Sequence, residues 1–349
     1  MPTTNAALTA LFMQEFRWCA VAAGESAAIL TESGSREDYA EAAHGALAAL
    51  GARPFQLSLP SHSPLEGEVA SIARGNASSC LLDRYPEVAE LLKAVDLIVD
   101  LSLEGLIHSK QRGALLAAGA RILLIREPPD ALERLLPSAA RNRRIDRAVE
   151  RLGGAAEMTV ASPAGTDLRV DLGGAAVKGA YGFCDRPGTS ATWATCAVVA
   201  YPASTRVDGE VALACGDILF PFHRYVESPV TLSFRDGFVE EIAGGGLDAE
   251  LLRDYYARWN DRNAYGISHV GWGLHENALW DALSFYSRSE SAGVDGRSFA
   301  GNFLISTGPN YAAGLHSRCH FDIPMRRCTV ELDGDPVVVE GRLVDGGRD

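Results

Sequence analysis

The sequence predicts an α/β N-terminal part with a mostly parallel sheet, followed by an α+β C-terminal part that is largely antiparallel and carries a metal site. In the first part, apolar runs alternate with helical patterns, which is typical of parallel strands joined by crossover helices. In the second part, β-rich segments come in pairs around Asp-Gly or Gly turns, which is typical of hairpins. We therefore expect an α/β domain at residues 1–154 and an α+β domain at residues 155–349.

The N-terminal elements are predicted from short apolar runs and helical spacing. We expect strands and helices in alternation, with strands at residues 26–31, 55–59, 95–101 and 121–125 and helices at 36–50 and 110–118. Gly51 follows the first helix as a C-cap residue should. No G-x-G-x-x-G segment follows the first strand, so a dinucleotide site is not supported. Residues 128–138 and 141–147 are predicted as surface helix and linker.

The C-terminal elements are predicted mainly from turn chemistry. Three hairpins are expected, with arms at residues 158–161 and 168–172, 231–234 and 238–242, and 328–332 and 337–339. A helix is expected at residues 248–259, after three consecutive glycines. This pattern gives few crossover helices and therefore predicts an antiparallel arrangement.

Charge and composition exclude several classes of protein. The chain has 349 residues and a formal net charge of −13, which disfavours a nucleic-acid partner. No apolar stretch is long enough to span a membrane, and the first ten residues lack a basic leader region, so we expect a cytoplasmic protein. The seven cysteines form no C-x-x-C pair, and we expect most of them to be small buried residues in a reducing compartment.

The most specific local feature is the segment His320-Phe321-Asp322. Residues i and i+2 of a strand point to the same face, so an imidazole and a carboxylate would meet on one side of a rigid element. Two readings follow from this pattern. The pair is either part of a metal site or a hydrogen-bonded His–Asp pair without a metal.

A metal would need a third ligand, and His269 is our first choice. It lies in a segment with Gly271 and Gly273, which suggests that the backbone approaches another group closely. His275 and His316 are competing candidates for the same position. Two histidines and one carboxylate on one face would leave open coordination positions, as in non-haem iron(II) enzymes that use dioxygen.

His108 is a separate candidate. It follows the third predicted strand, and the carboxyl ends of parallel strands are where α/β sheets place ligands. A histidine there can act as a general acid and base near neutral pH. The alternative is a solvent-facing residue at the start of a helix.

Three segments of the C-terminal half resemble the thermophilic metallo-aminopeptidases of the aminopeptidase T type. They are residues 181–188, residues 263–273, and residues 301–311 followed by 320–322. The sequence departs from that pattern. His269 stands in place of a glutamate ligand, residues 194–202 contain no glutamate, and Leu304 stands near an expected histidine. A second metal therefore lacks ligands, which argues against peptidase activity.

The remaining pattern, with ligands for one metal, resembles a divergent branch of that fold family, the 2,5-dihydroxypyridine 5,6-dioxygenases. The resemblance implies one iron(II) ion (Fe²⁺) held by His269, His320 and Asp322, with His108 as the acid–base residue. It also implies ring opening of a small aromatic N-heterocycle by O₂ to N-formylmaleamate, and a homo-oligomer. The family has a further histidine near Trp193, where this chain has none.

Three residues are expected to contact the substrate, namely Ile107, Ser109 and Ser306. Ser306 is a candidate hydrogen-bond donor, and a turn hydroxyl is the alternative interpretation. Two other functions stay open at this point. One is an aminopeptidase-like metallohydrolase, and the other is a non-catalytic domain stabilised by a metal.

Overall fold

The computed structural model describes residues 4–60, 81–103, 105–107, 109–203 and 206–344, and these residues form two compact units. The N-terminal unit comprises Met1–Ser138, Tyr181–Thr195 and Ser289–Ala292. The C-terminal unit comprises Ala139–Ala180, Cys196–Arg288 and Gly293–Asp349. The domain boundary that the change of sequence pattern predicts between residues 154 and 155 stays a prediction.

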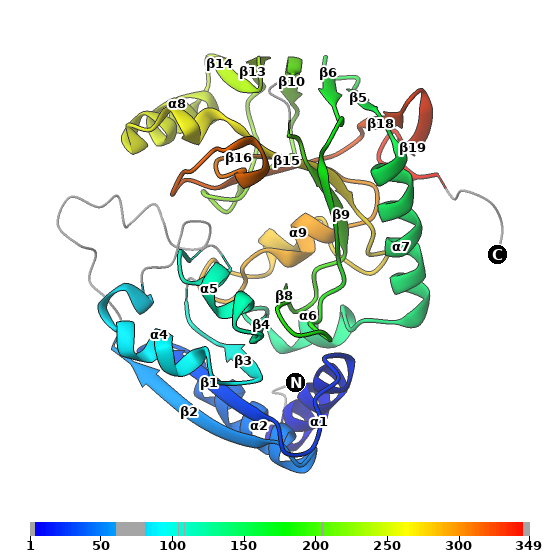
Figure 1. Cartoon of the computed structure of the whole chain (residues 1–349). Helices are drawn as coiled ribbons and strands as arrows, with labels where there is room; N and C mark the ends of the chain where they lie inside the picture. Colours follow the sequence, from blue (N-terminus) through cyan, green and yellow to red (C-terminus); the bar gives the residue numbers. More distant parts are fainter. Residues whose placement is uncertain (1–3, 61–80, 104, 108, 204–205, 345–349) are drawn as a thin grey trace. The chain divides into compact units, whose positions relative to one another are not determined.

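The N-terminal unit is built on a five-stranded parallel sheet in the order β2-β1-β3-β4-β8 (Figure 1). Its strands are β1 (Ser26–Glu32), β2 (Arg53–Leu59), β3 (Leu97–Asp100), β4 (Arg121–Leu124) and β8 (Ser190–Thr192). The predicted parallel sheet is confirmed. Its fifth strand was not foreseen, because β8 is only three residues long and comes from a distant part of the chain.

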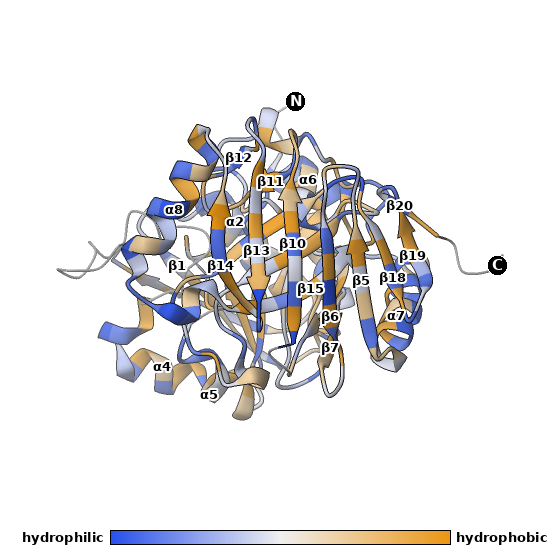
Figure 2. Ribbon diagram, turned by 90° about the horizontal axis from the view of Figure 1, so that it is seen from above, coloured by the Kyte–Doolittle hydropathy of each residue, from blue (hydrophilic) through white to orange (hydrophobic). Residues whose placement is uncertain are grey.

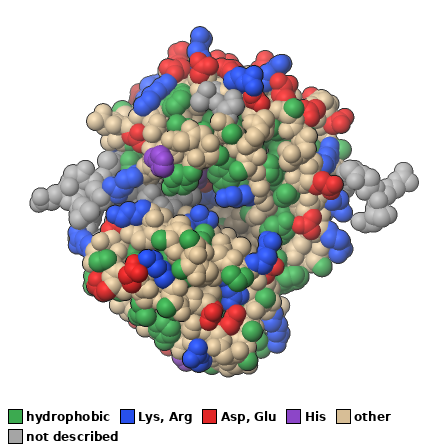
Figure 3. Space-filling model, in the orientation of Figure 1, with side chains coloured by type: hydrophobic (Ala, Val, Ile, Leu, Met, Phe, Trp, Pro, Cys, Tyr) green, Lys and Arg blue, Asp and Glu red, His purple; other side chains and the backbone are tan. Residues whose placement is uncertain are grey.

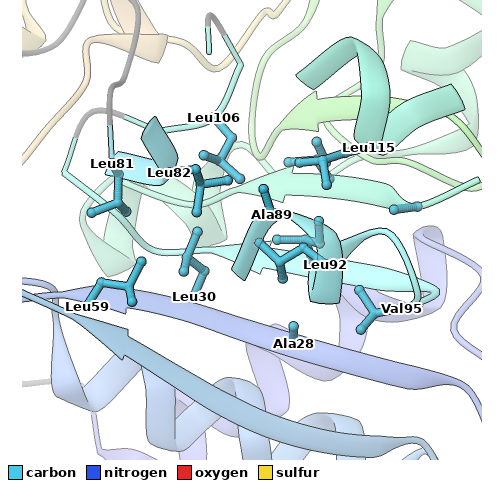
Figure 4. Packing of buried hydrophobic residues seen from close by; sticks show 13 residues of the cluster. Ala28, Leu30, Leu59, Leu81, Leu82, Ala89, Leu92, Val95, Leu106 and Leu115 are labelled. Atoms are coloured by element: carbon cyan, nitrogen blue, oxygen red, sulfur yellow. The ribbon is translucent and has the colours of Figure 1, made fainter. Parts of the chain in front are cut away.

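Helices precede or follow the strands of this sheet along the chain. They are α1 (Asn5–Trp18), α2 (Glu37–Ala49), α4 (Pro86–Leu92), α5 (Arg112–Ala117) and α6 (Pro129–Arg134), with a 3₁₀ turn, η1, at Leu81–Arg84. Figure 4 shows how apolar side chains from β1, η1, α4 and α5 pack together in the core of this unit. Ile98, Leu106 and Leu115 are fully buried, so this packing fixes the carboxyl end of β3 and the chain that follows it.

The C-terminal unit contains an eight-stranded antiparallel sheet in the order β14-β13-β10-β6-β5-β18-β19-β20 (Figure 2). Its strands are β5 (Glu157–Ala161), β6 (Asp167–Asp171), β10 (Val207–Leu213), β13 (Val230–Arg235), β14 (Phe238–Ala243), β18 (Thr329–Leu332), β19 (Asp335–Val339) and β20 (Arg342–Leu343). All three predicted hairpins occur here, between β5 and β6, β13 and β14, and β18 and β19. The antiparallel character predicted for this part is confirmed.

A second antiparallel sheet of the same unit has the order β17-β16-β15-β9-β7. Its strands are β7 (Ala176–Ala180), β9 (Ala197–Tyr201), β15 (Ile267–Gly273), β16 (Phe303–Thr307) and β17 (Phe321–Met325). Two short strands, β11 (Ile218–Leu219) and β12 (Arg224–Tyr225), pair separately. The three strands β15, β16 and β17 are completely buried.

The helices of the C-terminal unit are α7 (Ala139–Gly154), α8 (Leu247–Trp259) and α9 (Val294–Ser298), with 3₁₀ turns η2 (Arg262–Tyr265), η3 (Ala282–Ser284) and η4 (Tyr311–Ala313). The linker predicted at residues 141–147 is wrong, because α7 runs through it and packs against β7 and β9. Ile145, Ala148 and Leu152 recur at helical spacing and form its buried face.

The surface carries both signs of charge. Figure 3 shows acidic and basic side chains interspersed over the visible face. Within the described residues, no helix combines the length and the apolar character that crossing a membrane requires.

Candidate metal centre

Three neighbouring strands place polar side chains in one row. In the pairing of β15 with β16, His269 stands opposite Ser306, and in the pairing of β16 with β17, Ser306 stands opposite Asp322. Directly paired residues of antiparallel strands point to the same face of the sheet. The row His269–Ser306–Asp322 is therefore set by the hydrogen-bond register of three buried strands.

A β-bulge gives His269 its place in this row. The register of β15 against β16 shifts by one residue between Ile267 and His269, so that Ser268 is the additional residue. Its hydroxyl donates a hydrogen bond to the carbonyl of Pro309. Because side chains alternate along a strand, this extra residue decides on which face the imidazole of His269 lies.

The glycines near His269 allow the strand to approach its neighbours. A Cβ atom on Gly271 would lie 1.9 Å from the carbonyl oxygen of Val198 in β9. On Gly273 it would lie 2.4 Å from the carbonyl oxygen of Phe299. The close approach that the sequence suggests is thus to other parts of the backbone.

His320 joins the row from the residue immediately before β17. Its Nε2 lies 3.1 Å from Oδ1 of Asp322, and Nε2 of His269 lies 3.5 Å from the same oxygen. One ligand atom from each of the three residues lies within 4.8 Å of the others, and all three side chains are buried. The strand parity of the His-x-Asp segment therefore produces the predicted meeting of an imidazole and a carboxylate.

Burial and neighbouring charges shift the pKa values of two of these groups. Burial lowers the pKa of His269 to about 4, although Asp322 opposes that shift. Burial alone would raise the pKa of Asp322, but His320 and Arg297 hold it well below its usual value. Near neutral pH the site therefore offers a neutral imidazole at His269 and an ionised carboxylate at Asp322.

Two further residues bind the carboxylate of Asp322. Nε of Arg297, in α9, donates to Oδ2 at 2.6 Å, and the hydroxyl of Ser306 donates to Oδ1. The sequence predicts Ser306 near a substrate, but it gives no indication of Arg297. Arg297 belongs to a five-residue helix and lies 25 residues before Asp322 in the sequence, so no local pattern connects the two residues.

The donor set fits a divalent transition metal. Two nitrogens and one oxygen at about 2.1 Å from a common centre would be about 3 Å apart, close to the separations found here. Nδ1 of His269 is buried and has no hydrogen-bond partner among the described residues.

Tyr201, the last residue of β9, is the neighbour of His269 on the adjacent strand of the sheet. Its ring meets the ring of His269 edge to face, with centroids 5.5 Å apart. Nζ of Lys178 lies 5.1 Å above the centre of the same tyrosine ring. Sequence patterns gave no indication of this aromatic neighbour, because it depends on which strand pairs with β15.

The competing histidines do not join the group. His275 is buried, and its Nδ1 accepts a hydrogen bond from the backbone N–H of Asn277. His316 is exposed, with its ring against that of Tyr311. Among the described residues, the cluster of potential metal ligands consists of His269, His320 and Asp322.

His108 lies outside the described residues, whereas its neighbours Ile107 and Ser109 belong to the N-terminal unit. Ser109 is buried, and its hydroxyl has no hydrogen-bond partner among the described residues. The chain before it is fixed by Asp100, which accepts hydrogen bonds from the hydroxyl and N–H of Ser102 and from the N–H of Leu106. Asp100 is fully buried and was not foreseen as an organising residue.

Trp193, where the resemblance predicts a histidine nearby, is fully buried in the N-terminal unit. Its ring packs edge to face on Phe12, with centroids 5.0 Å apart. At this position the chain therefore has a core residue.

Comparison with known proteins identifies the family of this chain. The family model NicX, described as 2,5-dihydroxypyridine 5,6-dioxygenase, matches residues 7–345. A 2,5-dihydroxypyridine 5,6-dioxygenase of Pseudomonas putida is 36% identical over 348 residues, covering 99% of this chain and 98% of that protein.

Solved structures point the same way. The structure of the 2,5-dihydroxypyridine dioxygenase from Pseudomonas putida superposes with a TM-score of 0.92 and 35% identity, covering 99% of both chains. AmpT from Thermus thermophilus has a TM-score of 0.67 and 18% identity, covering 97% of this chain and 98% of that one, a likeness of fold alone. The predicted aminopeptidase T-like fold is thus confirmed, and the chain belongs to the 2,5-dihydroxypyridine 5,6-dioxygenase family.

Proposed function

We propose that this protein is an iron(II)-dependent, extradiol-type dioxygenase that opens the ring of 2,5-dihydroxypyridine with O₂ to give N-formylmaleamate. The observation that carries the proposal is the buried convergence of His269, His320 and Asp322 in a member of this family. Such a reaction serves pyridine breakdown of the nicotinate type. We further propose a cytoplasmic homo-oligomer, with its metal site in a domain formed by residues 155–349.

The three ligands suit the metal that we propose. Two imidazoles and a carboxylate on one face are typical of non-haem iron(II) sites, which leave positions open for other ligands. When bound, the ion would supply the redox chemistry that lets O₂ react with an aromatic ring. Arg297 and Ser306 would hold the carboxylate of Asp322 in place, since both contact it already.

The remaining chemistry falls to the protein's own side chains. His108 would take a proton from a ring hydroxyl and return it later, a role worth about 10²–10⁴-fold in rate. Ile107, Ser109 and Ser306 would contact the substrate. The unpaired buried hydroxyl of Ser109 is consistent with such a contact, because a buried donor needs an acceptor. The hydroxyl of Ser306 donates to Asp322, and its oxygen would still be able to accept a hydrogen bond from the substrate.

The decisive experiment measures oxygen uptake. The protein is loaded with iron(II) without air, mixed with 2,5-dihydroxypyridine, and followed with an oxygen electrode and by product analysis. We expect one O₂ consumed for each ring opened and one iron bound per chain. No oxygen uptake, or two zinc ions per chain with hydrolysis of an aminoacyl p-nitroanilide, would contradict the proposal in favour of a metallohydrolase.

A substitution tests the metal ligands separately. His320→Ala should lose both iron and turnover, because two ligands bind a divalent ion more weakly than three. His316→Ala, at an exposed histidine of the same unit, is the matched control and should keep both. If His320→Ala kept full activity, His320 would not belong to the site.

A further inference from the structure

Arg297 is fixed against the carboxylate of Asp322 by several contacts. Its Nε lies 2.6 Å from Oδ2 of Asp322, and its guanidinium lies 3.7 Å from the centre of the Phe220 ring. The N–H of Phe220 in turn donates to the backbone carbonyl of Asp322. The side chain of Arg297 is only 17% exposed, so this ion pair is largely shielded from water.

The carboxylate therefore has two different oxygens. Oδ2 is bound to the guanidinium, whereas Oδ1 accepts a hydrogen bond from the neutral hydroxyl of Ser306 and faces the two imidazole nitrogens. An oxygen that already binds a guanidinium is a poor metal ligand, so Asp322 would offer only Oδ1 to an ion between the histidines. One-oxygen binding leaves one more coordination position open than two-oxygen binding would.

The guanidinium also changes the charge that a bound ion presents. With both imidazoles neutral, the formal charges of His269, His320, Asp322 and Arg297 add up to zero. A divalent ion held by the three ligands would keep its full double charge toward anything that enters the open positions. Without the arginine, the carboxylate would cancel half of it.

We propose that Arg297 is a positioning residue that restricts Asp322 to one ligand oxygen and cancels its charge, so that the site binds its metal less tightly but binds an anionic substrate more tightly. The proposal deepens the proposed function, because it takes a divalent ion at His269, His320 and Asp322 as given. A hydroxypyridine that has lost a hydroxyl proton is such an anion. Arg297 thus lowers the affinity for the metal ion and raises the affinity for the anion. An arginine with a merely structural role would not change the two affinities in opposite directions.

The test compares Arg297→Gln, Arg297→Lys and a matched control in the full chain. The control is Arg326→Gln, which removes a guanidinium stacked on Trp280 in the same unit, 3.6 Å from the ring centre. Metal affinity is measured by titrating metal-free protein with Co²⁺ against a coloured chelator. Anion affinity is measured by titrating the Co²⁺-loaded protein with azide and following its visible spectrum.

We expect Arg297→Gln to bind Co²⁺ about tenfold more tightly and azide about tenfold more weakly, because it removes a positive charge beside the ion. Arg297→Lys keeps the charge and should stay within about threefold of the wild type in both titrations. Arg326→Gln should change neither. Weaker Co²⁺ binding by Arg297→Gln, or unchanged azide binding, would overturn the proposal.

If Arg297→Gln fails to fold, Arg297→Lys decides. A tenfold loss of azide affinity in the lysine variant would show that the positive charge at position 297 does not control anion binding, and it would overturn the proposal. Neither titration uses 2,5-dihydroxypyridine or O₂, so an absence of oxygen uptake would refute the proposed function without touching this inference. Failure of the wild type to bind Co²⁺ would overturn it.

Discussion

The buried imidazole of His269 makes the stability of the metal-free protein depend on pH. Its pKa is about 4 in the folded chain, against about 6.5 for an exposed histidine in an unfolded one. Between these values the unfolded state binds more protons than the folded state, so acidification favours unfolding. From pH 7.5 to pH 4.5 this single group should remove about 2.5 kcal/mol from the free energy of unfolding.

The assay is urea unfolding of the metal-free protein at both pH values. His269→Asn removes the titrating ring, so its loss of stability on acidification should be smaller than that of the wild type by about 2.5 kcal/mol. His316→Asn, at an exposed histidine of the same unit, serves as the matched control. If His269→Asn loses as much stability as the wild type between the two pH values, the argument from burial is refuted.

Three further substitutions test buried packing and local hydrogen bonding in the two units. Phe321→Ala should lower the free energy of unfolding by about 3–5 kcal/mol in urea titrations, because the ring is fully buried among tyrosines. Gly271→Ala should reduce both stability and metal content, since its Cβ would lie 1.9 Å from the carbonyl oxygen of Val198; an unchanged metal stoichiometry would contradict this. Asp100→Asn should lower turnover at unchanged metal content, because it weakens the hydrogen bonds that order the chain up to Leu106. Steady-state kinetics with metal analysis checks that expectation.

Much of the fold could be predicted because its signals are local. The hairpin between β13 and β14 forms around Asp236-Gly237, where both residues have positive φ, and such turns are visible in the sequence. The strand β8 could not be predicted, because only its pairing with β4 makes it a strand. Helix α7 was misread as a linker because its basic residues hid three buried apolar positions.

The metal site also has parts that the sequence predicts and parts that it does not. The meeting of His320 with Asp322 follows from strand parity alone, and the structure brings the two side chains together. The choice of His269 over His275 and His316 depends on the register of β15 against β16, which includes a bulge that no sequence rule located. Arg297 was not predictable, because it meets Asp322 only through tertiary packing.

The likeness of this fold to AmpT shows why the activity must be argued from the row of side chains. The ladder that joins β15, β16 and β17 uses backbone N–H and C=O groups, so it does not depend on which polar side chains point out of the sheet. Polar residues in the row can therefore be exchanged while the scaffold persists. The charge of the row, in contrast, changes with each exchange. At Asp322 the guanidinium of Arg297 offsets the charge of the carboxylate, and burial keeps the imidazole of His269 neutral near pH 7. Such a row would suit a single divalent ion, whereas a second ion nearby would need further carboxylates to offset the repulsion between two double charges.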